Sequence, residues 1–121
     1  MPEPELLETV NLSDGRSMSF ASFGDPAGKP VFYFHGFPGS RFEPQSNHEE
    51  YLKAGIRLLA LDRPGVGQSS RKSKRKLLDW PNYVVEVAKI LNLKKFSVLG
   101  VSGGGPYALA CARAIPGYLD K

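Results

Sequence analysis

Three apolar runs in this chain each break abruptly into a turn of small or polar residues, and helical patterns lie between the runs. They cover residues 31–34, 56–61 and 96–101. Continuous apolar runs of this length are typical of strands that are covered on both faces. Strands that alternate with helices favour parallel pairing through right-handed crossovers. The pattern therefore predicts an α/β fold with a mostly parallel sheet and helices on both faces.

Two further strands are predicted ahead of these runs. Residues 8–12 and 18–23 have apolar residues in strand-like patterns, and Asp14-Gly15 between them is a turn signal. Residues 24–30 form a loop by composition, since Gly and Pro recur there. The chain is thus expected to begin with a hairpin.

Three helices are predicted, at about residues 43–54, 77–91 and 106–115. The second has the clearest pattern because its apolar residues recur at 3.6-residue spacing on one face. Asp79 is expected to be its N-cap and Pro81 to lie in its first turn.

Length and composition bound the class of protein. A chain of 121 residues makes a single domain at most, so residues 1–121 are assigned to one domain. The net charge of +4 is concentrated at residues 71–76, a basic run without interleaved aromatic residues. We interpret this run as a solvated loop, with a nuclear-import or polyanion-binding patch as the alternative. No nucleic-acid partner is expected.

A cytoplasmic location is expected. The N-terminal segment is acidic and lacks the apolar region of a signal peptide, and no stretch reaches membrane-spanning length, so no membrane partner is expected. The single cysteine, Cys111, has no partner for an internal disulfide, which is consistent with a reducing compartment. Cys111 lies in an alanine-rich helix and is expected to be a buried structural thiol.

The third apolar run ends in the pattern Gly100-x-Ser102-x-Gly104, which is the signature of a nucleophile elbow. A serine on a strained strand-to-helix turn leaves no room for a Cβ two positions to either side, so glycine is required there. The helix that follows places its positive end and a free backbone N–H beside the hydroxyl, where they can stabilise an oxyanion. A glycine-rich turn without chemistry is the alternative.

Polar residues follow all three apolar runs. His35-Gly36, Asp62-Arg63 and Ser102 each come directly after a predicted strand. Parallel α/β sheets carry their sites at the carboxyl ends of the strands. These residues are therefore expected to meet at one edge of the sheet.

Three turn motifs in this order closely resemble those of the α/β-hydrolase superfamily. They are His-Gly-Phe-Pro-Gly-Ser at residues 35–40, Asp-Arg-Pro-Gly-Val-Gly-Gln-Ser at residues 62–69, and the elbow at residues 100–104. The resemblance extends from about residue 8 to the end of the chain. It implies the α/β-hydrolase fold, here in truncated form with strands one to five only.

The resemblance also implies roles for individual residues. Ser102 would be the nucleophile, and the backbone N–H groups of Phe37 and Gly103 would form the oxyanion hole. Gly36 and Pro38 would shape the loop that carries the Phe37 amide. The implied reaction is hydrolysis of a small-molecule ester, lactone or small amide through an acyl-enzyme, without a cofactor.

Other residues of these motifs would have structural roles. Gly100 and Gly104 would shape the elbow, and Gly65 and Gly67 would allow the tight turn after the fourth strand. His35 would brace the oxyanion loop through hydrogen bonds.

Differences between these motifs and those of related families restrict the type of reaction that the resemblance implies. Epoxide hydrolases and haloalkane dehalogenases share the first two motifs but use an aspartate nucleophile, whereas this chain has Ser102. Proline iminopeptidases resemble the chain less, since they have a second glycine in place of Phe37 and a tryptophan in place of Gly103. The HGGG oxyanion loop of one lipase group is also absent.

The remaining members of a catalytic triad are not found in the sequence. In this superfamily an acid and then a histidine follow the nucleophile, but here only Asp120 follows and no histidine does. The chain is therefore interpreted as the N-terminal half of a hydrolase domain. It is expected to associate with itself or with the missing C-terminal half. The alternative is a non-catalytic remnant that acts as a binding or interaction module.

Two other site types are disfavoured. His48 lies in a polar helix and is expected to be exposed, and no His, Cys, Asp or Glu cluster has metal-ligand spacing. Gly65-Val-Gly67 follows a strand as in dinucleotide-binding proteins, but Ser70 stands where the last glycine or alanine should be.

Overall fold

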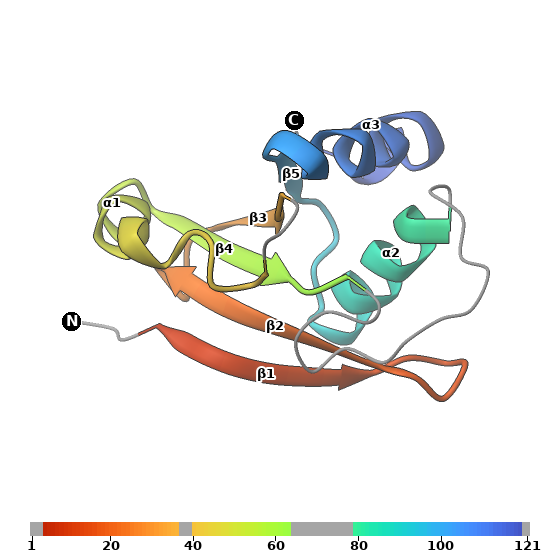
Figure 1. Cartoon of the computed structure of the whole chain (residues 1–121), viewed down its shortest axis with the longest axis horizontal. Coiled ribbons are helices and arrows are strands. Elements are labelled where there is room, and N and C mark those ends of the chain that lie inside the picture. The colour runs from red at the N-terminus through yellow and green to blue at the C-terminus, as the bar shows by residue number, and fades with distance from the viewer. Residues whose placement is uncertain (1–3, 37–39, 64–78, 120–121) are drawn as a thin grey trace.

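The computed structural model describes residues 4–36, 40–63 and 79–119, which form a five-stranded sheet with helices against it (Figure 1). The order of the strands across the sheet is β1-β2-β4-β3-β5. The strands are β1 (Glu5–Asn11), β2 (Ser17–Gly24), β3 (Lys29–Phe34), β4 (Ile56–Leu61) and β5 (Ser97–Gly100). The α/β class is confirmed.

The sheet is mixed. β3 pairs in parallel with both β4 and β5, as the alternation of strands and helices predicts. β1 and β2 add two antiparallel pairings, with each other and between β2 and β4. The predicted hairpin at Asp14-Gly15 is confirmed: Gly15 has a φ of 86°, and the Leu12 N–H donates to Arg16 O at 2.7 Å.

The helices are α1 (His48–Lys53), α2 (Trp80–Ile90) and α3 (Gly105–Ala114), with short 3₁₀ turns at η1 (Gln45–Asn47), η3 (Ser102–Gly104) and η4 (Pro116–Tyr118). The first predicted helix is therefore shorter than expected and begins as a 3₁₀ turn. Residues 77 and 78 lie outside the described residues. Asp79 is the N-cap residue of α2 and Pro81 lies in its first turn, both as predicted, although the Asp79 side chain makes no capping hydrogen bond.

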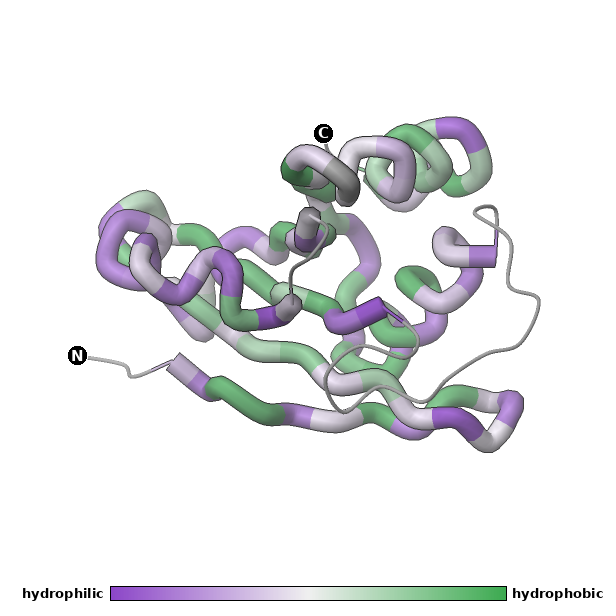
Figure 2. Tube along the Cα trace, in the orientation of Figure 1, coloured by the Kyte–Doolittle hydropathy of each residue, from purple (hydrophilic) through white to green (hydrophobic). Residues whose placement is uncertain are grey.

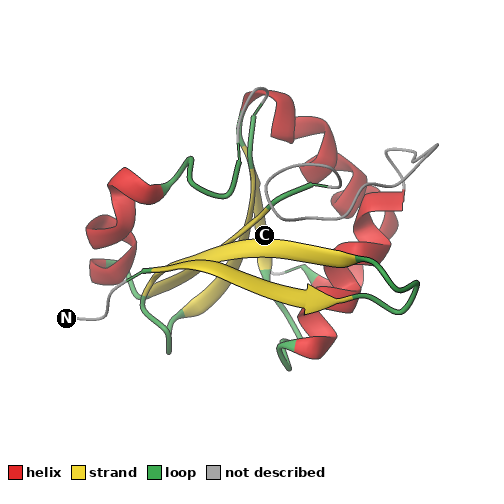
Figure 3. Ribbon diagram, turned by 60° about the horizontal axis from the view of Figure 1, so that its bottom comes forward, coloured by secondary structure: helices red, strands yellow, loops and turns green. Residues whose placement is uncertain are grey.

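Helices cover both faces of the twisted sheet (Figure 3). On one face, α2 and α3 enclose the larger core, in which the Trp80 ring meets Phe34 edge-on at 5.3 Å. On the other face, α1 packs against β2 and β4, and a smaller core contains Phe23 and Leu58. Figure 2 shows the apolar residues concentrated along the central strands, where both cores meet the sheet.

β5 is less buried than its apolar sequence suggests. Phe96 is fully buried, but Leu99 is 41% and Val101 is 38% exposed, so the prediction of a strand covered on both faces is wrong here. Phe96 and Val98 belong to the core under α2 and α3, whereas Leu99 and Val101 alternate onto the opposite face. On that face α1 packs against β2 and β4, away from β5.

The outer edge of β5 is touched at one end by the residues that follow η4. Leu119 forms a parallel bridge with Phe96, and the Phe96 N–H donates to Tyr118 O at 3.0 Å. The chain after α3 therefore runs alongside β5 on the side away from β3. Within the described ranges, no helix combines the length and apolar character needed to cross a membrane.

Candidate active site

Ser102 lies at an abrupt break between β5 and the helical segment that follows. Val101 is extended, with φ −115° and ψ 125°, whereas Ser102 has a φ of 52°. The left-handed conformation costs a residue that has a Cβ about 1 kcal/mol or more. The side chain is exposed, and it lies where η3 begins and leads directly into α3.

The glycines on either side of Ser102 have no room for a side chain. A Cβ at Gly104 would overlap Phe34 O and lie 2.7 Å from the Phe34 carbonyl carbon. A Cβ at Gly100 would lie 2.7 Å from the Gly104 carbonyl carbon. Since real Cβ atoms do not approach backbone this closely, the local backbone of the elbow depends on glycine at both positions.

The end of β3 lies directly against this elbow. A Cβ built at Gly36 would be 3.3 Å from Val101 O and 3.4 Å from the Ser102 Cβ. The structure thus brings the first and third predicted motifs together at one edge of the sheet. Phe37 and Pro38 lie outside the described residues, and Gly103 is part of η3.

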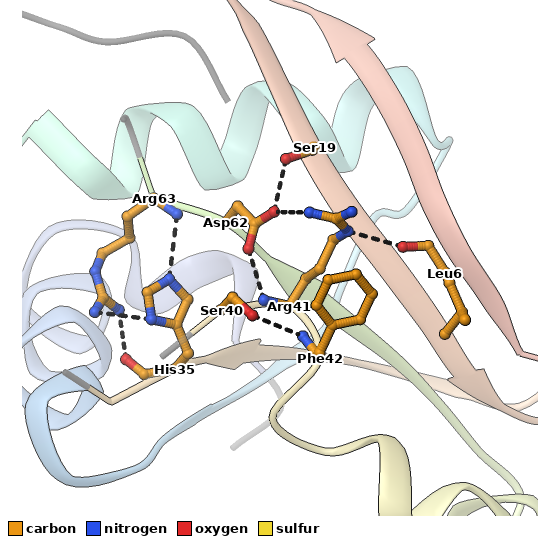
Figure 4. Close-up of polar contacts among 8 residues, drawn as sticks. All are labelled: Leu6, Ser19, His35, Ser40, Arg41, Phe42, Asp62 and Arg63. Atoms are coloured by element: carbon orange, nitrogen blue, oxygen red, sulfur yellow. Dashed lines mark hydrogen bonds and ion pairs between the residues drawn. The ribbon is translucent and has the colours of Figure 1, made fainter. Parts of the chain in front are cut away.

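The His35 ring is buried and has a partner at each nitrogen (Figure 4). Its Nδ1 donates to Gly36 O at 2.9 Å, and its Nε2 accepts the Arg63 backbone N–H at 3.4 Å. A neutral ring that is protonated at Nδ1 satisfies both contacts. Burial lowers the pKa of His35 below its ordinary value of 6.5, and the Arg63 charge acts in the same direction, while the hydrogen bond to Gly36 opposes them. His35 therefore braces the turn after β3.

Arg63, at the end of β4, encloses His35 on one side and contacts α3 on the other. Its Nη1 donates to His35 O at 2.6 Å, and its Nη2 lies 3.1 Å from His35 Nδ1. The Arg63 Cζ lies 4.3 Å from the centre of the Tyr107 ring on α3. Sequence reasoning placed Arg63 at a strand end but assigned it no role, because its partners are distant in sequence.

Asp62, beside Arg63, is fully buried and joins three parts of the chain (Figure 4). Its carboxylate accepts the Arg41 backbone N–H at 2.6 Å, the Arg41 Nη1 at 2.7 Å and the Ser19 hydroxyl at 2.7 Å. The Arg41 Nε donates to Leu6 O at 2.8 Å, which ties β1 into the same network. Nothing in the local sequence pattern marks Arg41 as the partner of Asp62.

Glu43, like Arg41, is a polar residue of this site that lies outside the three motifs. Its carboxylate accepts the Tyr33 hydroxyl at 2.6 Å and the Gly36 N–H at 3.1 and 3.2 Å. Burial, together with this hydrogen bond, raises the pKa of Tyr33. The neutral Tyr33 hydroxyl therefore positions the Glu43 carboxylate, which in turn accepts the Gly36 N–H next to the elbow.

His48 is not a simple exposed residue, as the sequence suggested. Its Nδ1 accepts the Gly24 N–H at 2.9 Å, and its ring meets the Phe23 ring edge-on at 6.3 Å. The side chain is half-buried and lies against β2. His48 is therefore engaged in holding α1 to the sheet.

The described part of the chain contains no group of His, Cys, Asp and Glu that could hold a metal ion. Cys111 is fully buried, and burial raises its pKa to about 12. The expectation of a buried thiol on the alanine-rich helix is confirmed.

A protein-family model described as the alpha/beta hydrolase fold matches residues 29–120. A non-heme chloroperoxidase from Streptomyces lividans is 35% identical over 117 residues, which cover 93% of this chain and 42% of that protein. A probable proline iminopeptidase from Streptomyces coelicolor is 28% identical over 120 residues, which cover 93% of this chain and 37% of that protein. The chain thus spans about two fifths of the length of these relatives.

Solved structures show the same fold at lower sequence identity. A hydrolase from Pseudomonas aeruginosa superposes with a TM-score of 0.85 at 22% identity, over 95% of this chain and 43% of that one. An epoxide hydrolase from Vigna radiata superposes with a TM-score of 0.81 at 19% identity, over 93% of this chain and 37% of that one. The resemblance at these identities concerns the fold.

Proposed function

Because the chain belongs to the family of the alpha/beta hydrolase fold, we propose that it is the nucleophile-bearing part of a serine hydrolase, with Ser102 as the nucleophile. The observation that carries the proposal is the conformation of Ser102. An exposed serine has a φ of 52° between an extended residue and the start of a helix. Residues other than glycine that adopt such strained conformations cluster at functional sites.

The surroundings of Ser102 support stabilisation of an oxyanion. The helical segment that starts at Ser102 has its N-terminal end, which carries the positive end of the helix dipole, beside this serine. We assign the oxyanion hole to the amides of Gly103 and Phe37, the second of which follows the Gly36 backbone that packs against the elbow. Gly36 and Pro38 shape this loop in the proposal, and His35 braces its first residue.

The substrate class follows from the nucleophile. A serine hydroxyl attacks a carbonyl carbon and forms an acyl-enzyme that water then hydrolyses. We therefore propose a small-molecule ester, lactone or small amide as substrate, hydrolysed without a cofactor. The relative named as a proline iminopeptidase supports the inclusion of amides in this class.

A second candidate is a binding or interaction module without catalysis. A serine at its ordinary pKa is a weak nucleophile and needs an adjacent base. Both ring nitrogens of His35 have partners, the His48 Nδ1 accepts the Gly24 N–H, and these are the only two histidines of the chain. The engagement of both histidines favours the module for residues 1–121 taken alone, whereas the nucleophile site would need a base from another chain or segment.

The test is covalent labelling of the intact chain with a fluorophosphonate, followed by peptide mapping. We expect slow labelling of Ser102, faster in the folded chain than in the same chain unfolded in urea, because only the folded elbow supplies oxyanion donors. Ester turnover should stay near background. Ser102→Ala should abolish the labelling, whereas Ser97→Ala, at the other end of β5, should not.

The possible results separate the two candidates. Equal labelling of folded and unfolded chains would show that the elbow gives Ser102 no special reactivity, and would contradict the nucleophile assignment. Rapid labelling with measurable ester turnover would contradict the module and require a base within this chain.

A further inference from the structure

The backbone at the elbow packs against a carbonyl group that Arg63 holds. A Cβ at Gly104 would lie 2.9 Å from His35 O, so Gly104 and the His35 carbonyl are in direct contact through backbone atoms. The Arg63 Nη1 donates to this same oxygen at 2.6 Å. The Arg63 guanidinium therefore holds the His35 carbonyl, against which the backbone of the elbow packs.

Arg63 also contacts the helix that follows the elbow. Its guanidinium lies over the Tyr107 ring, and Tyr107 in turn meets Trp80 of α2 edge-on at 5.7 Å. A planar guanidinium can stack on an aromatic face and donate in its own plane at the same time, which an ammonium cannot do. One side chain thus links the end of β3 to α3, on either side of Ser102.

The burial of Arg63 indicates that these contacts are a fixed part of the folded structure. The residue is 5% exposed, whereas arginines are rarely buried without specific partners. Its backbone N–H adds a third contact with the same histidine, at Nε2. A surface arginine that served only solubility would have none of these features.

The geometry points to Arg63 as a positioning residue that fixes the Ser102 elbow through the His35 carbonyl and the Tyr107 ring. Arg63 orients these two groups and is not assigned a contact with substrate. The inference rests on the proposed function only in calling the elbow a catalytic element; the coupling itself concerns the structure of the chain.

Amide hydrogen exchange tests the coupling without relying on activity. The Val101 N–H donates to Phe34 O and the Gly104 N–H donates to Val101 O, so these two amides report on the elbow. The Lys29 N–H, which donates to Gly55 O at the far end of β3, serves as the reference. We expect Arg63→Leu to speed exchange at the elbow amides about tenfold relative to the reference.

Conservative and matched variants separate positioning from general stability. Arg63→Lys retains a donor for His35 O and should recover part of the protection, while Tyr107→Leu should cause a similar loss to Arg63→Leu. Arg16→Leu is the matched control because the Arg16 Cζ lies 4.6 Å from the Tyr83 ring on α2, away from the elbow. It should leave the ratio of elbow to reference exchange unchanged.

An unchanged ratio in the Arg63 and Tyr107 variants would overturn the inference, even if Ser102 reacts with a fluorophosphonate. A changed ratio in a chain whose Ser102 does not react would support the inference and contradict the proposed function. If Arg63→Leu does not fold, Arg63→Lys and Tyr107→Leu decide the question.

Discussion

The Asp62 carboxylate, with no exposed surface, binds Arg41 twice, through the backbone N–H at 2.6 Å and through Nη1 at 2.7 Å. The two residues are 21 positions apart and lie after β4 and after β3, respectively. Their contact joins the segment that follows the first motif to the strand end that carries the second. It is the most deeply buried ion pair within the described ranges.

Removal of one charge from this pair should be costly. Asp62→Asn leaves the Arg41 guanidinium without its buried counter-charge, and we expect a loss of about 3 kcal/mol in the free energy of unfolding. Asp14→Asn is the matched control because Asp14 pairs with Arg16 at 2.8 Å near the surface, where such a pair contributes about 0.5 kcal/mol. Urea unfolding of both variants measures the difference, and equal losses would contradict a special role for the buried pair.

Replacement by alanine should change the stability of the chain in opposite directions at two adjacent glycines, Gly104 and Gly105. Gly104→Ala forces a Cβ against Phe34 O and should destabilise the chain by about 2 kcal/mol or more. Gly105 has helical φ and ψ and nothing within 4 Å of its Cβ position, so Gly105→Ala should stabilise by about 0.5–1 kcal/mol. Thermal unfolding midpoints test the sign, and a neutral Gly104→Ala would show that the turn tolerates a side chain.

Stability should fall as the pH drops below about 6.5 because of His35. Burial lowers the pKa of the folded ring, so the unfolded chain takes up a proton that the folded chain does not. The contribution is complete above the ordinary pKa of 6.5 and is lost as the pH falls toward the lowered value. His35→Gln should flatten this slope. Denaturant unfolding of the wild-type chain and the variant at several pH values measures the slope, and an unchanged slope in His35→Gln would contradict the assignment to His35.

Self-association is expected through the outer side of β5. Within the described residues, this strand pairs with β3 along one side and makes only the bridge between Phe96 and Leu119 on the other, and Leu99 and Val101 are exposed next to that outer side. Apolar strand edges of this kind pair with other chains, and a charged side chain on the edge blocks such pairing. Leu99→Lys should therefore reduce association measured by size-exclusion chromatography with light scattering. Leu109→Lys, at a more exposed leucine on α3, should not. A wild-type chain that remains monomeric at micromolar concentration would contradict the expectation.

The elements of the fold were predictable because local patterns encode them. Apolar runs located β3 and β4, the Asp-Gly turn located the hairpin, and Gly100 and Gly104 located the elbow. Each of these signals acts within a few residues. The insertion of β4 between β2 and β3 was not predictable in this way, because strand order depends on contacts between residues far apart in the sequence.

The polar contacts around the site were less predictable. Arg63 and Asp62 were placed correctly at a strand end. No local sequence pattern identifies their partners, Tyr107 and Arg41. Glu43 belonged to a predicted polar helix, and only the fold brings it to Gly36. For β5, the apolar sequence suggested burial, yet burial of Leu99 requires a neighbouring element that the local pattern does not specify.

The buried thiol of Cys111 can report on the local opening of α3, the helix on which it lies. The thiol is fully buried in the core between α3 and the sheet, and burial raises its pKa to about 12, so almost no reactive thiolate exists while α3 stays in place. No other cysteine competes for an alkylating reagent. The rate at which iodoacetamide modifies the native chain therefore measures how readily α3 opens. This helix begins three residues after Ser102.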